Sequence, residues 1–308
     1  MLESFGRNPA NASQFGLILQ VNPQVTTLGG LSYLAESASA LLDEPISPYL
    51  TARTDSDGRG KRFSLWMRAA SGHTRQTVAS TLSGGGLVLS AAPEMRIEHQ
   101  ALTAGADLGF DLGGSGWILH LGVLGGWYDA DATVAGSGRL GVEAPFAGGY
   151  VAVGNGAFTL DGTIRKEWRH YDLNLPSLFG TAGPQELDGG ATAASVRGSY
   201  RIGRASGLAA MPFVGFSYAD SDIDSLGSDF TPGRDKTKIG EAGLRLSYRT
   251  ASDASVTFEP FASASALRNW SRGDEAAFGF GGSAATFALD TATWKDAMRY
   301  SVGLIGSA

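Results

Sequence analysis

The chain has 308 residues, of which 43% are hydrophobic, and a formal net charge of −6. No run of 18 or more apolar residues occurs, so a membrane-spanning helix is excluded, whereas a membrane-spanning β-strand needs only alternating apolar and polar residues. The absence of cysteine excludes thiol chemistry and thiolate-bound metals, and the absence of a basic run argues against a nucleic-acid partner.

The amino-terminal part of the chain predicts one helix. Residues 1–22 are irregular and show no signal-peptide pattern, so an exported form of the chain would need its export signal upstream. Asn22 and Pro23 are typical of a helix N-cap followed by proline at the first helical position. Leucines then recur at steps of three and four, which predicts an amphipathic helix over 23–43. Residues 44–61 are rich in Pro, Asp and Gly, as expected of a linker.

From Phe63 onward apolar and polar residues alternate, and the 44 glycines are about twice the usual share. Both features indicate strands and tight turns rather than helices. The ten predicted strands cover residues 62–73, 97–113, 116–129, 140–154, 157–172, 190–203, 207–219, 238–250, 254–269 and 296–306.

Short and long connections alternate strictly between these strands. The short ones have the glycine, asparagine, aspartate or serine of hairpin turns and cover 113–116, 155–156, 203–206 and 250–253. The long polar ones cover 74–96, 130–139, 173–189, 220–237 and 270–295. A soluble β-sandwich gives no reason for this segregation, whereas an outer-membrane barrel has short periplasmic turns and long external loops.

The spacing of aromatic residues supports a strand in a membrane. Trp117 and Trp127 share one face of a predicted strand, ten residues apart. A tilted strand of that length rises roughly 25 Å, the height of the apolar band on an outer-membrane barrel. Lys166 shares the lipid face and would have to extend to the rim beside Trp168. The residues predicted to form the two aromatic girdles are Trp117, Trp127, Phe158, Trp168, Tyr218 and Tyr248.

The opposite face of the strands carries a nearly balanced set of charges. The predicted lumen-facing residues are Arg68, Asp107, Asp111, Asp161, Arg165, Glu167, Arg169, Arg197, Arg201, Glu241, Arg245, Arg249 and Glu259. They favour a polar lumen whose charges pair with one another and with the helix. Holding the helix as a plug and guiding an extended polypeptide remain alternatives that the sequence does not separate.

Four segments resemble the translocator domain of autotransporters, the type V secretion family. They are FSLWMRAASG (63–72), GADLGFDLG (105–113), MPFVGFSYAD (211–220) and FEPFASASALRNW (258–270), preceded by a helical segment. The resemblance implies an all-β fold, a transmembrane antiparallel barrel of twelve strands in the Gram-negative outer membrane, with the helix in the lumen. It also implies an upstream passenger on the cell surface, a monomer embedded in outer-membrane lipid, and barrel-assembly machinery as a partner. No enzymatic activity and no cofactor are implied.

The carboxyl terminus departs from the family pattern, which ends on a strand with an aromatic last residue. This chain ends in SVGLIGSA after the tenth predicted strand. Either two strands are missing or the count of ten is wrong. We expect missing strands, because ten strands alone would form an open sheet with two free edges. The expected domains are the end of a passenger or linker at 1–22, the lumen helix and linker at 23–61, and the barrel at 62–308.

Three other functions remain possible from the sequence. A porin-like channel without a passenger would share the barrel. An outer-membrane hydrolase would need a rim histidine, and His73, His99 and His170 fall near external strand ends with Asp129 and Asp172. A soluble sandwich would bury the apolar faces between two sheets. We predict no catalytic, cofactor-binding or metal-binding residue, and the sequence does not decide the passenger's identity or cleavage of the linker at Asn8, Asn11 or Asn22.

Overall fold

The computed structural model describes residues 30, 31, 34, 42, 62–77, 79–84, 87–92, 94–113, 116–134, 139–174, 185–203, 207–224, 230–231, 235–249, 257–271, 274–279, 286–292 and 296–307. Of the predicted helix over 23–43, only Gly30, Leu31, Leu34 and Leu42 are among them, and all four are helical and buried. Within the described part of the chain, no helix is long and apolar enough to cross a membrane. The predicted linkers at 1–22 and 44–61 lie outside the described residues.

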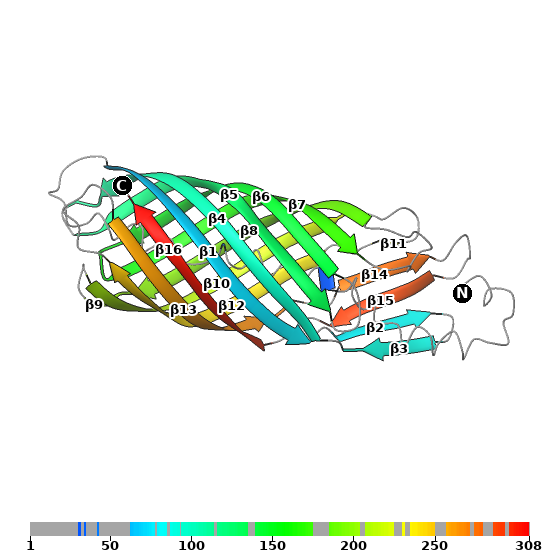
Figure 1. Cartoon of the computed structure of the whole chain (residues 1–308). Coiled ribbons are helices and arrows are strands. Elements are labelled where there is room, and N and C mark those ends of the chain that lie inside the picture. The colour runs from blue at the N-terminus through cyan, green and yellow to red at the C-terminus, as the bar shows by residue number, and fades with distance from the viewer. Residues whose placement is uncertain are drawn as a thin grey trace, which may run out of the picture.

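Ten long antiparallel strands form a closed barrel with strongly tilted strands (Figure 1). They are β1 (Arg62–Thr77), β4 (Glu94–Asp111), β5 (Ile118–Val134), β6 (Arg139–Gly154), β7 (Phe158–Asn174), β8 (Gln185–Tyr200), β10 (Gly207–Ile223), β12 (Asp235–Arg249), β13 (Thr257–Asn269) and β16 (Asp296–Ser307). Each pairs with the next of these strands along the chain. The two-residue strand β9 (Ile202–Gly203) adds to the start of β10.

The expectation that ten strands would leave an open sheet was wrong. The last long strand, β16, pairs with the first, β1, over eight residues from Trp66 opposite Ser307 to His73 opposite Tyr300. The ring thus has no free edge among the ten strands, because each edge that a flat sheet would expose finds a partner when the tilted strands curl round.

Two of the short connections, after β4 and after β6, lie at the same end of the barrel, and backbone hydrogen bonds between described residues close them. The Leu112 N–H donates to the Trp117 carbonyl at 2.9 Å, and the Asn155 N–H donates to the Phe158 carbonyl at 3.0 Å. Gly113, Gly116 and Gly156 adopt positive φ values of 73°, 72° and 83°. Glycine is the residue that adopts this conformation without strain, so the glycines predicted to mark the turns are needed there.

Three of the long connections contain strands where the sequence predicted only loops. A second sheet of five short strands extends beyond the opposite end of the barrel (Figure 1). Its members are β2 (Ala79–Gly84), β3 (Leu87–Ala91), β11 (Phe230–Thr231), β14 (Asp274–Gly279) and β15 (Thr286–Ala292). Pairing of β15 with β2 joins two hairpins far apart in the sequence, a non-local contact that alternation within each loop does not reveal.

The two faces of the wall differ in exposure residue by residue. On β7 the outward Ile164 is 60% exposed, whereas the inward Arg165 is 3% exposed. Val123 on β5 and Val214 on β10 are likewise outward and more than 60% exposed. A soluble sandwich would bury these apolar side chains between two sheets, so the closed barrel with an apolar outer surface excludes that alternative.

Candidate functional site in the barrel interior

The inner wall holds most of the charged residues that the sequence assigned to it. Eleven of the thirteen are buried: Arg68, Asp107, Asp161, Arg165, Glu167, Arg169, Arg197, Arg201, Arg245, Arg249 and Glu259. Glu241 is half-buried, and Asp111, the last residue of β4 beside a turn, is exposed. Strand alternation accounts for this placement, since every member has inward parity on its strand.

Glu167 lies at the centre of the most completely buried charge cluster. Its Oε1 atom accepts from Arg165 Nε at 2.8 Å, and its Oε2 atom accepts from Arg169 Nη2 at 2.7 Å. The Tyr128 hydroxyl, from β5, also donates to Oε2 at 3.0 Å. Because the Glu167 carboxylate is fully buried between two guanidinium groups on its own strand, its charge is compensated where water is absent.

A second acid, on β12, contacts residues of three other strands. Glu241 on β12 forms ion pairs with Arg197 of β8 and, at 3.3 Å, with Arg299 of β16. The Ser265 hydroxyl of β13 donates to Glu241 Oε1 at 2.6 Å. Arg299 is buried and inward, yet the sequence analysis omitted it, although residues 296–306 were predicted as a strand and its parity would have identified it.

The third acid of this kind, Glu259, lies near the short-turn end. Arg249 donates to Glu259 from Nη2 at 2.9 Å, and Arg201 Nη1 lies 3.8 Å from the other carboxylate oxygen. Arg245 lies over the Phe261 ring at 3.6 Å from the centroid, a cation–π contact. These contacts hold Arg201, which directly follows β8, and two arginines of β12 against one side of the interior.

A fourth cluster contains neutral as well as charged groups. Asp107 on β4 contacts His120 Nδ1 at 2.6 Å and accepts from the Tyr150 hydroxyl at 2.8 Å. The Trp66 Nε1–H in turn donates to the Tyr150 hydroxyl at 2.7 Å. Gly122 makes room for this arrangement, because a Cβ at that residue would lie 2.4 Å from the Tyr150 ring. Sequence reasoning found Asp107 but missed the other three members, which only the strand register brings together.

The inner wall becomes apolar near the end with the long connections. Met95, Ile97, Leu140 and Leu173 are inward and have no exposed surface. The helical residue Gly30 lies against two of these side chains. A Cβ placed on Gly30 would be 2.9 Å from Met95 Sδ and 3.4 Å from Leu140 Cδ1. The interior therefore has an apolar collar on β4–β7 as well as a charged region, and the prediction of a polar inner face missed the collar.

The predicted girdle residues all have outward parity on their strands. Phe158, Trp168, Trp127 and Tyr248 are exposed, and Trp117 and Tyr218 are half-exposed. Trp117 and Phe158 meet edge-on near the short turns with ring centroids 6.1 Å apart. Tyr200, Trp270 and Tyr300 are also outward and more than half exposed, and the sequence analysis did not include them.

The three rim histidines do not form a common site. His99 is buried and inward, His73 is exposed on β1, and His170 is outward on β7, with three strands between β1 and β7. His170 Nδ1 instead pairs with Asp188 Oδ1 at 2.8 Å, and this hydrogen bond raises the pKa of the imidazole. The three histidines therefore do not converge on one site within the described part of the chain.

Comparisons with known proteins give one consistent answer on fold. A family model described as autotransporter beta-domain matches residues 65–307. The chain is similar to the β-domain of the Bordetella autotransporter BrkA, at 19% identity and a TM-score of 0.50, over 80% of this chain and 98% of that one. It is also similar to the transport unit of the autotransporter AIDA-I from Escherichia coli, at 13% identity and a TM-score of 0.54, over 94% and 98% of the two chains. No curated protein matches the sequence.

Proposed function

This chain belongs to the autotransporter β-domain family and is an outer-membrane translocator unit, and from that premise we propose that its barrel encloses the segment joining it to an upstream passenger. In this proposal the barrel anchors that segment from inside, and the passenger reaches the cell surface through the pore. The wall acts as an enclosure and does no chemistry of its own.

The observation that carries the proposal is the burial of the helical residues that precede the barrel. Leu31 and Leu34 are buried almost completely, and Gly30 lies against the apolar collar of Met95 and Leu140. An apolar inner surface at the water-exposed end of a barrel is costly unless an apolar partner covers it. The leucine face of a helix supplies such a partner, and a glycine at the contact allows the backbone to approach closely.

The remaining partners follow from the family and the outer surface. The apolar band of Val123, Ile164 and Val214 suits outer-membrane lipid. We propose that the protein is a monomer delivered by the barrel-assembly machinery, because the closed ring leaves no barrel strand edge for a second copy to pair with.

Single-channel conductance in planar bilayers tests the proposal. The full chain is compared with a variant lacking residues 1–45, and heat-modifiable migration verifies that both barrels are folded. Removal of an enclosed segment should raise the conductance, since the open cross-section grows. A porin-like channel without a passenger predicts equal conductance, and that result would overturn the proposal.

A single substitution sharpens the same test. Gly30→Leu adds a side chain where only about 3 Å separates the Cβ position from Met95, so the segment should be displaced and the conductance raised without any deletion. Ala69→Leu, on the outer face of β1, is the matched control and should leave the conductance unchanged.

A further inference from the structure

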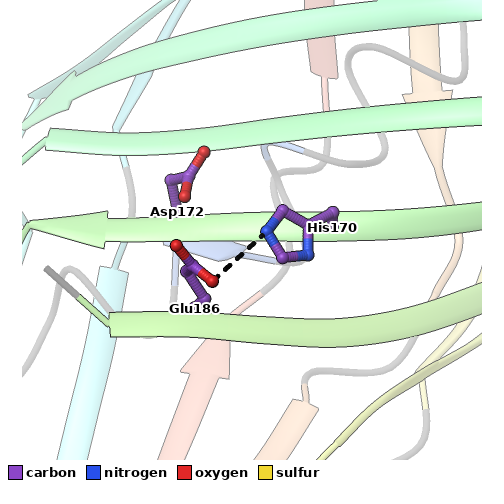
Figure 2. Close-up of side chains that lie close together, drawn as sticks. All are labelled: His170, Asp172 and Glu186. Carbon is purple, nitrogen blue, oxygen red and sulfur yellow. Dashed lines mark ion pairs between the residues drawn. The ribbon is translucent and has the colours of Figure 1, made fainter.

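Three metal-binding side chains meet on the outer face of the barrel, just beyond the aromatic girdle. His170 and Asp172 follow Trp168 on the outward face of β7, and Glu186 lies opposite on β8 (Figure 2). The apolar band ends at Trp168, so the three side chains lie on the water side of it, at the end with the long connections.

The three side chains are close enough to share one ion. One ligand atom from each lies within 4.8 Å of the other two, and His170 Nε2 is 3.9 Å from Glu186 Oε2. A tetrahedral zinc ion with bonds near 2.1 Å holds its ligand atoms roughly 3.4 Å apart. Small rotations of partly exposed side chains close that difference, so no backbone movement is required.

A fourth residue orients the imidazole for this role. The register places His170 directly opposite Asp188, and Asp188 Oδ1 accepts from His170 Nδ1 at 2.8 Å. The ring therefore turns its other nitrogen, Nε2, toward Glu186 (Figure 2). Histidines that bind metals commonly donate their second N–H to a carboxylate in this way, which fixes the tautomer with Nε2 as the free ligand atom.

The surrounding charge also favours a cation. Asp172 and Glu186 lie directly opposite each other on neighbouring strands, an arrangement that is destabilising for two like charges. On the other side of Asp172, Gly141 has no side chain to fill the space, and the nearby Asp131 pairs with Arg139 at 3.8 Å. A bound dication offsets this repulsion and joins β7 to β8 at the rim.

We propose that His170, Asp172 and Glu186 bind a divalent first-row metal of the zinc type, with Asp188 as the positioning residue. One imidazole with two carboxylates is a donor set that suits zinc, and three protein ligands leave a fourth position for water. Sequence reasoning placed His170 and Asp172 near an external strand end but did not connect them with Glu186, which a long connection separates from β7.

Calorimetric titration of the folded full chain in detergent with zinc chloride, at about pH 8, tests the proposal. We expect one ion per chain and at least a tenfold weaker affinity in His170→Ala and in Glu186→Gln. His73→Ala removes another exposed rim histidine and should bind zinc as the unmodified chain does. Unchanged zinc affinity in His170→Ala would overturn the proposal, and so would equal loss in His73→Ala.

Three further measurements separate this site from nonspecific binding to acidic side chains. Asp188→Asn should weaken zinc binding by about 10- to 100-fold while leaving the stoichiometry at one. Cobalt as a probe should give the visible absorption of a nitrogen- and oxygen-bound ion, and the signal should be lost in His170→Ala. Displacement of zinc by an equal concentration of calcium would show that carboxylates alone bind the ion and would overturn the proposal.

Discussion

The same strands carry opposite chemical patterns in two regions of the wall, the apolar band and the rim above it. On β5 the outward residues of the band include Val123 and Trp127, but two residues later the outward positions hold Asp129 and Asp131. The inward positions change in the reverse sense, from the charged and aromatic interior of the band to the fully buried Ala132 at the rim. Strands β7 and β8 change in the same way, from Arg165 and Arg197 inside the band to Leu173 and Leu187 at the rim.

The difference shows that the medium outside a strand, hydrocarbon or water, determines which of its two faces is apolar. Below the girdle the outside is hydrocarbon, so apolar side chains face outward and charges pair inside. Above it the outside is water, and the strands behave as an ordinary half-buried sheet with an apolar inner face. That inner face is the collar that contacts Gly30, so the rim is built like a small soluble core on top of a membrane barrel.

The largest expected effect comes from removing charge inside the band. Glu167→Gln leaves Arg165 and Arg169 buried without their carboxylate, which should lower the free energy of unfolding by about 3–5 kcal/mol. Urea unfolding in detergent, followed by tryptophan fluorescence, measures the change. Glu143→Gln on the outer rim of β6 should have no measurable effect, and equal losses in the two variants would contradict a difference between the regions.

A comparable loss is expected from opening the apolar collar. Leu140→Ala removes a fully buried side chain from the inner rim and should cost about 2–5 kcal/mol, the usual range for such a cavity. Val151→Ala on the lipid face of the same strand creates no enclosed cavity and should cost less. The same urea titration checks both, and a larger loss for Val151→Ala would show that the collar is not a packed core.

Much of the barrel was predictable because a period of two is visible within a single strand. The ten strands, the turns at Gly113 and Asn155, and the inward arginines all follow from local alternation. Contacts that depend on register between strands were not predictable, which is why the Tyr150 cluster and the His170 cluster were missed. The closure of β16 onto β1 was missed for the same reason, since no local pattern specifies which edges meet.

The apolar collar was missed for a different reason. The alternation was interpreted with one rule, that apolar residues face lipid. This rule was applied along the whole length of each strand. Ile97 and Leu140 obey the opposite rule because their strands have already left the membrane. Where the outward positions change from Trp127 to Asp129, the sequence itself marks the boundary at which the rule reverses.

A charge on the outer surface tests that boundary directly. Val123→Arg places a cation in the apolar band of β5 and should destabilise the folded barrel in lipid by about 2–4 kcal/mol. Thr133→Arg makes a similar change on the same face of the same strand, ten residues further along and above the girdle, and should be tolerated. Folding yield into lipid vesicles measures both, and equal yields would place the two residues in the same environment.

The smallest effect concerns one hydroxyl in the band interior. Tyr150→Phe removes the acceptor of the Trp66 indole N–H and one donor to Asp107, but leaves the Asp107 contact with His120 in place. A buried N–H without an acceptor costs about 1–3 kcal/mol, so a loss in that range is expected in urea unfolding. Tyr200→Phe, outward and exposed on β8, removes the same hydroxyl from the lipid side and should change stability less. If both variants lost the same amount, the buried Tyr150 hydroxyl would contribute no more to stability as a link between β1, β4 and β6 than an exposed hydroxyl does.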